Sequence, residues 1–174
     1  MDKKTTVCLT LAMYTKDMKR YIRRSLPQEF FTHPAYLRAL VLGFVYLFLI
    51  ITQLFTYEKF GGIVRAYQLP GGEVVVFLVA GLIPLLEIAA LPFLLSMRVS
   101  ARTRKLSRAA MLIVPVLWFV IGLWLVFTAD MTTESGLFGA TIPVGSGLWL
   151  IAFSILFAWS AYLVSRELPK RRTK

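Results

Sequence analysis

Four long apolar runs dominate the pattern of hydrophobic and polar positions along the chain. They cover about residues 37–57, 74–95, 109–129 and 144–165. Each run is close to the ~20 residues that a helix needs to cross ~30 Å of hydrocarbon at 1.5 Å per residue. The pattern therefore predicts an all-α membrane protein with a bundle of four transmembrane helices.

Small and polar residues recur at helical spacing in the first and last runs. The first stripe is Ala39, Gly43, Tyr46, Ile50, Gln53 and Tyr57. The last stripe is Gly147, Ile151, Ser154, Ala158, Ala161 and Ser165. Transmembrane helices associate through such stripes, because lipid supplies no hydrophobic drive between helices. We expect both stripes to face the bundle interior. The residues expected on the outer side of the first run are Leu42, Phe44, Leu47 and Phe48.

Basic residues alternate between the two sides of the predicted bundle. The chain has 20 Lys and Arg against 9 Asp and Glu, and its mean hydropathy is +0.69. The bases gather before the first run, between the second and third, and after the fourth, whereas the other connections hold only Lys59 and Arg65. This positive-inside distribution predicts a multi-pass protein of a prokaryotic cytoplasmic (inner) membrane with both termini in the cytoplasm. Because the bases flank spans rather than interleave with aromatics, we expect no nucleic-acid binding.

The charge pattern also divides the chain. Residues 1–33 form a basic arm, residues 34–165 the transmembrane domain and residues 166–174 a basic cytoplasmic tail. Apolar residues recur at helical spacing in the arm, which predicts an amphipathic interfacial helix held on anionic lipid. A disordered basic arm is the alternative.

Several chemistries are excluded by composition. Cys8 is the only cysteine and His33 the only histidine, so an intramolecular disulfide, a CxxC redox pair and a His or Cys metal cluster are ruled out. The sequence has no glycine-rich phosphate loop and no acid cluster. We therefore expect no metal site and no autonomous enzymatic activity.

Glu87 is the one acid inside a hydrophobic run, and a charge there indicates a functional site. Counting 1.5 Å per residue from the span ends places Tyr46, Trp118 and Trp159 at a similar depth in the inner half of the bundle. We expect these four residues to form one layer. In one interpretation Glu87 is protonated and bonded to Tyr46, or to a carbonyl freed by proline, as a link between helices. In the other it accepts a proton beside a quinone or another lipophilic ligand.

The polar connections contribute further candidates. In the first outer connection, Gly61-Gly62 predicts a tight turn and residues 63–67 predict one or two helical turns. Arg65, Tyr67 and Pro70 are its candidate residues, with loop packing and ligand binding as the alternatives. We expect residues 98–108 to form a cytoplasmic loop and residues 130–145 an outer loop without a core of its own.

The first two runs resemble the DoxX/MauE-like membrane proteins. The resemblance is carried by the four spans, by the outer pattern Phe60-x6-Tyr67-x-Leu69-Pro70 and by Glu87 in the second span. It implies a compact four-helix bundle linked to respiratory or thiol redox systems, some of whose members are subunits of quinone-reducing enzymes. We therefore expect a membrane subunit or redox accessory protein, with quinone as the candidate cofactor, or a lipid, near Glu87. The lack of a cysteine pair argues against an autonomous thiol–disulfide role.

A structural or assembly protein that anchors a larger complex is the alternative function. Its basic arm would contact lipid or a cytoplasmic partner. The expected partners are the lipid bilayer, anionic lipid at the arm, and either another membrane protein or a second copy of the chain. A small transporter is disfavoured. Alternating access usually depends on inverted repeats, and this sequence shows no such repeat and only one intramembrane acid.

Overall fold

The computed structural model describes residues 33–97, 99–128, 134–142, 144–145 and 147–168. Its helices, in chain order, are α3 (Pro34–Phe55), α4 (Tyr57–Ala66), α5 (Gly72–Leu94), α6 (Ala101–Thr128) and α7 (Leu148–Glu167). The only β pairing among these residues is an isolated antiparallel bridge between Glu134 and Gly145. The predicted helical arm, up to residue 32, and most of the basic tail lie outside the described residues.

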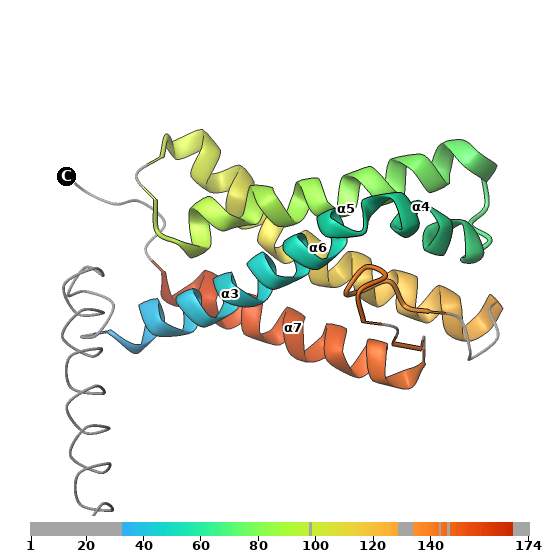
Figure 1. Cartoon of the computed structure of the whole chain (residues 1–174). Helices are drawn as coiled ribbons and strands as arrows, with labels where there is room; N and C mark the ends of the chain where they lie inside the picture. Colours follow the sequence, from blue (N-terminus) through green and yellow to red (C-terminus); the bar gives the residue numbers. More distant parts are fainter. Residues whose placement is uncertain (1–32, 98, 129–133, 143, 146, 169–174) are drawn as a thin grey trace, which may run out of the picture. The chain divides into compact units, whose positions relative to one another are not determined.

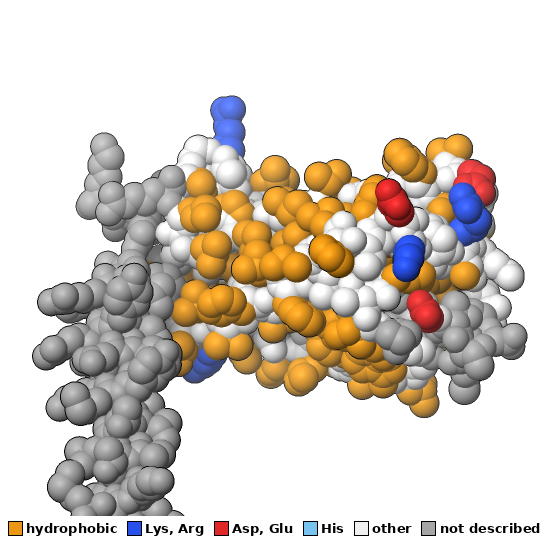
Figure 2. Space-filling model, viewed as in Figure 1, with side chains coloured by type: hydrophobic (Ala, Val, Ile, Leu, Met, Phe, Trp, Pro, Cys, Tyr) orange, Lys and Arg blue, Asp and Glu red, His pale blue; other side chains and the backbone are white. Residues whose placement is uncertain are grey.

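Four of these helices, α3, α5, α6 and α7, are long and apolar enough to cross a membrane. They lie side by side, and successive long helices run in opposite directions (Figure 1). Helix α6 packs against both α5 and α7. Hydrophobic side chains cover the flank of the bundle, and charged side chains gather toward its two ends (Figure 2). The predicted all-α bundle of four transmembrane helices is confirmed.

Helix α6 begins at Ala101, so the predicted loop at residues 98–108 is wrong over most of its length. The side chain of Ser100 accepts a hydrogen bond from the Thr103 N–H at 3.2 Å, which is the geometry of a helix N-cap. The following residues are mainly Arg, Lys, Leu and Ala, which are good helix formers. Arg104 is buried in this first part of α6, with its guanidinium 5.2 Å from the ring centre of Phe93.

The predicted turn at Gly61-Gly62 is also wrong, because both glycines lie inside α4. Phe60 and Val64, one helical turn apart, are fully buried and give α4 an apolar face. Tertiary packing of this face outweighs the low helix propensity of glycine. The chain instead reverses at residues 68–72, where Gln68, Gly71 and Gly72 adopt positive φ.

The predicted inner stripe of α3 is buried from Ala39 to Gln53. Two assignments on this run are wrong. Tyr57 belongs to α4 and is exposed, and Leu42 is buried because it lies on the same helical face as Ala39 and Tyr46. Phe44, Leu47 and Phe48 are exposed, as predicted. In the last run Ser154, Ala161 and Ser165 are buried, whereas Gly147, Ile151 and Ala158 are half-buried.

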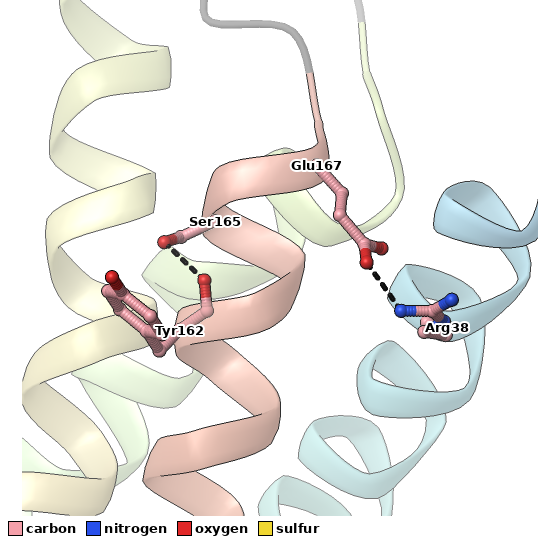
Figure 3. Close-up of polar contacts among 4 residues, drawn as sticks. All are labelled: Arg38, Tyr162, Ser165 and Glu167. Carbon is pink, nitrogen blue, oxygen red and sulfur yellow. Dashed lines mark hydrogen bonds and ion pairs between the residues drawn. The ribbon is translucent and has the colours of Figure 1, made fainter.

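One end of the bundle carries an ion pair between two helices that are far apart in the sequence. Arg38 near the start of α3 pairs with Glu167 at the end of α7 (Figure 3). On the same α7 turn the Ser165 hydroxyl donates to the Tyr162 carbonyl at 2.8 Å. The pair connects the start of α3 to the end of α7. Because both charged side chains are partly exposed, it contributes little to stability.

Prolines interrupt the backbone hydrogen bonds of α5 and α6, and at Pro115 in α6 a side chain of another helix supplies the missing donor. Pro115 has no N–H to donate to the carbonyl of Met111, four residues earlier. The hydroxyl of Tyr46 on α3 donates to this carbonyl at 2.6 Å. The hydrogen bond that Pro115 removes within α6 is thus replaced by one between α3 and α6.

A side chain of α6 also bonds to the backbone of α5 beside Pro92. The Ser107 hydroxyl on α6 accepts a hydrogen bond from the Phe93 N–H at 2.9 Å and donates to the Ala90 carbonyl at 3.1 Å. Because lipid offers no hydrogen-bond partners, a carbonyl freed by proline inside a membrane span needs a donor from the protein, as Tyr46 supplies for Met111.

Tyr46→Phe is expected to lower the free energy of unfolding by roughly 1 kcal/mol, because it leaves the Met111 carbonyl without a donor. The loss should shrink in a Pro115→Ala background, where the backbone regains an N–H for this carbonyl. Tyr162→Phe, at an exposed tyrosine, is the control. Unfolding in mixed micelles measures all three, and equal losses in both backgrounds would contradict the assignment.

Candidate functional site

Glu87 lies in the bundle interior, where three helices meet. Its carboxyl is fully buried on α5. One oxygen, Oε1, accepts a hydrogen bond from Gln53 Nε2 of α3 at 3.2 Å and another from Trp118 Nε1 of α6 at 3.3 Å. We call Glu87, Gln53 and Trp118 the Glu87 layer. The sequence predicted Glu87 and Trp118 as neighbours but placed Gln53 only on the inner stripe.

The amide of Gln53 has a second partner outside the helices. Its Nε2 also donates to the carbonyl of Leu137 at 3.1 Å. Leu137 belongs to the 134–142 segment, which lies between α6 and α7 in the chain. The buried acid is therefore connected through one side-chain amide to the end of the bundle.

Two oxygens of the Glu87 layer have no hydrogen-bond partner among the described residues. They are Glu87 Oε2 and Gln53 Oε1, and both are buried. The described residues form two ion pairs, Arg38–Glu167 and Arg65–Glu73, and neither includes Glu87. An isolated carboxylate is costly to bury. A protonated carboxyl is neutral, and its O–H can donate a hydrogen bond to an amide oxygen that has no other partner. This arrangement suits a neutral acid.

The predicted layer is wrong for Trp159, and the Tyr46 hydroxyl donates to the Met111 carbonyl and not to Glu87. Tyr46 lies two helical turns before Gln53 on α3, roughly 10 Å along the axis, and its ring packs against Phe157 at 4.9 Å. Trp159 is 60% exposed. Phe157 and Ala161 occupy the buried face of α7, and Trp159 lies on the opposite face. Depth along the axis did not reveal that Trp159 faces outward.

Tyr67, in the connection between α4 and α5, is fully buried and joins three parts of the chain. Its hydroxyl donates to the Ser135 carbonyl at 2.6 Å, and its own carbonyl accepts from Trp124 Nε1 of α6 at 3.0 Å. Burial, and secondly the charge of Glu134, raise the pKa of Tyr67, so the phenol remains a neutral donor near neutral pH. These contacts favour loop packing over ligand binding.

Arg65 and Pro70 lie at the surface. The Arg65 guanidinium pairs with both carboxyl oxygens of Glu73, at 2.8 and 2.9 Å. This hydrogen-bonded pair, and the charge of Glu73, raise the pKa of Arg65, but both side chains are exposed and contribute little stability. Pro70 is exposed on the reversal between α4 and α5. Arg65 and Pro70 are thus away from the Glu87 layer.

The 134–142 segment packs into the bundle end, contrary to the expected loop without a core. Leu137 is fully buried. Gly136 and Gly139 adopt positive φ, and a Cβ on Gly139 would lie 2.6 Å from the Thr52 carbonyl oxygen and 2.5 Å from Thr56 Oγ1. Only glycine permits this close approach. The spacing of two glycines around Leu137 is the sequence signal that could have indicated a buried turn.

Gln53→Leu is expected to speed amide hydrogen exchange across the 134–142 segment, because it removes the donor to the Leu137 carbonyl. Trp118→Phe removes only the α5–α6 bond, so it should lower stability by roughly 1 kcal/mol and leave this exchange unchanged. Gln68→Leu, at an exposed glutamine, is the control. If exchange in the segment responds equally to Gln53→Leu and Trp118→Phe, Gln53 does not hold the segment.

The Glu87 layer offers hydrogen-bonding groups but no metal-binding constellation. Among the residues that the structure describes, no three His, Cys, Asp or Glu side chains gather closely enough to hold a metal ion. Comparison of the chain with protein-family models, curated proteins and solved structures found no match. The geometry of the Glu87 layer and of the bundle end is therefore the basis for a functional proposal.

Proposed function

We propose that this protein is a membrane subunit or accessory protein that acts through a protein partner, and that the Glu87 layer links its helices into a rigid scaffold. The observation that carries the proposal is the double acceptance at Glu87 Oε1, from Gln53 on α3 and Trp118 on α6. Hydrogen bonds between membrane helices contribute roughly 0.6–2 kcal/mol each. Glu87 Oε1 accepts two of these hydrogen bonds, and Gln53 extends the connection to the 134–142 segment. Such an arrangement links elements of the fold and is not typical of a reactive site.

The partner belongs, on this proposal, to a respiratory or thiol redox system. This part rests on the resemblance to DoxX/MauE-like proteins through Tyr67, Leu69-Pro70 and Glu87. Tyr67 bonds to the 134–142 segment and to α6, and Glu87 bonds to α3 and α6. The residues that carry the resemblance therefore hold the bundle together, which supports a shared scaffold role.

A second candidate function is ligand binding at Glu87. The specific observation in its favour is the pair of buried, unbonded acceptors, Glu87 Oε2 and Gln53 Oε1. A hydroxyl group of a quinol or of a lipid would be a suitable donor to either oxygen. The two functions differ in what Glu87 must supply, since the scaffold needs an acceptor whereas ligand binding needs the carboxyl itself.

Glu87→Gln is expected to keep both the fold and partner association, because the amide oxygen still accepts from Gln53 and Trp118. Glu87→Leu removes the acceptor and should reduce both. Native mass spectrometry of gently extracted protein measures partners and bound quinone or lipid together. Glu58→Gln, at an exposed acid, is the matched control.

Loss of a bound quinone or of the partner in Glu87→Gln, with the fold intact, would contradict the scaffold proposal and favour ligand binding. If the basic arm anchors the partner, native mass spectrometry should give a different result. Deletion of residues 1–25 should then abolish partner association while Glu87→Gln leaves it intact.

We further propose that both termini lie in the cytoplasm of a prokaryote, with the 134–142 segment on the opposite face of the inner membrane. The alternating basic connections support this orientation. Cys8, the only cysteine, is a natural reporter. A membrane-impermeant maleimide should label Cys8 only after spheroplasts are permeabilised. In a Cys8→Ser background, Glu134→Cys should be labelled in intact spheroplasts, and the reverse labelling pattern would refute the orientation.

A further inference from the structure

A long apolar groove runs along the outside of α5 and α6. Its volume is about 660 Å³, within the ~300–1,000 Å³ typical of small-molecule sites. Helix α6 lines it from Leu112 to Trp124, a length of roughly 18 Å along the helix axis. Val75 and Val79 of α5 form part of the other wall, and Leu69-Pro70 line it near the start of α5.

The groove is lined by side chains that offer only hydrocarbon contact. Its residues are Leu, Val, Ile and Pro together with Trp124. The indole N–H of Trp124 already donates to the Tyr67 carbonyl. A bound molecule would therefore be recognised by shape and dispersion and not by hydrogen bonds.

The surroundings of the groove indicate a lipid chain. The groove is continuous with the lipid-facing surface, because Ile113, Val116 and Val120 belong to its wall and are also exposed on a membrane-spanning helix. Helices of a second copy or of a protein partner would dock through small or polar residues. The groove lining contains no Gly, Ala, Ser or Thr.

The reversal beside the groove carries charges of both signs. Arg65 and Glu73 flank Leu69-Pro70 in the chain, and both are exposed and paired with each other. A headgroup at this end of the groove meets a cation and an anion together. That arrangement complements a zwitterionic headgroup, because its phosphate can meet the Arg65 cation and its ammonium group the Glu73 anion.

We propose that the α5–α6 groove retains one zwitterionic phospholipid, with an acyl chain along α6 and its headgroup beside the Leu69-Pro70 reversal. The retained lipid packs against the outer side of the same two helices that the Glu87–Trp118 bond joins on the inner side. The site is separate from the Glu87 layer, and the inference does not depend on the function proposed above.

The test uses the full chain, extracted in a mild detergent from membranes and examined by native mass spectrometry. The wild-type protein should carry one phospholipid per chain that survives detergent exchange. Val116→Trp on α6 and Val79→Trp on α5 fill the groove from opposite walls, and each should reduce this occupancy at least tenfold. Leu156→Trp adds the same side chain at an exposed position of α7 and should retain the lipid as the wild type does.

After delipidation, rebinding from nanodiscs of phosphatidylcholine or phosphatidylglycerol tests the headgroup. Phosphatidylcholine should rebind and phosphatidylglycerol should rebind at least tenfold less. The proposal is overturned by a wild-type protein without a retained lipid, by a groove adduct with the mass of a quinone, or by a dimer that both groove variants dissociate. Folded Val116→Trp and Val79→Trp proteins with wild-type occupancy would overturn it equally.

Discussion

A polar group buried in hydrocarbon must find its partner inside the protein, and this constraint organises the bundle. Three such groups join helices here. The Met111 carbonyl, freed by Pro115, takes its donor from Tyr46, and Ser107 bonds to the backbone of α5 beside Pro92. The Glu87 carboxyl takes donors from α3 and α6. Because lipid supplies no hydrophobic drive between helices, these bonds and close side-chain packing determine which helix faces meet.

The same constraint reaches the connections at one end of the bundle. Gln53 bonds to Glu87 and to the Leu137 carbonyl with one amide nitrogen, so the interior and the 134–142 segment share a donor. Tyr67, in the connection between α4 and α5, bonds to the Ser135 carbonyl of the same segment. A segment rich in Thr, Ser and Gly thereby becomes part of the packed structure. Its glycines provide the close backbone approach that this packing needs.

Helices α5 and α6 are the pair on which the two functional proposals meet. Their inner side carries the Glu87–Trp118 bond and the Ser107 contacts, whereas their outer side forms the apolar groove. The inner hydrogen bonds hold α5 and α6 rigidly, so the shape of their lipid-facing surface is fixed. A membrane subunit that works through a partner needs such rigidity, since its contribution is position and not chemistry.

The sequence by itself determined the four membrane-spanning helices, most of the buried face of α3 and the presence of one acid, Glu87, inside a span. These features depend on length, periodicity and the cost of one acid in an apolar run, which are local properties of the chain. The start of α6 was also encoded locally, by the Ser100 N-cap. A loop was nevertheless predicted there, because the residues that follow are basic. Only the tertiary structure decided that Gln53 and not Tyr46 bonds to Glu87, and that Trp159 faces outward. The reason is geometric. Each residue turns a helix by about 100°, so the depth of Trp159 left its facing direction open. Tyr46 and Gln53 share one face of α3, so only the axial position of α3 against α5 decided which of them meets Glu87.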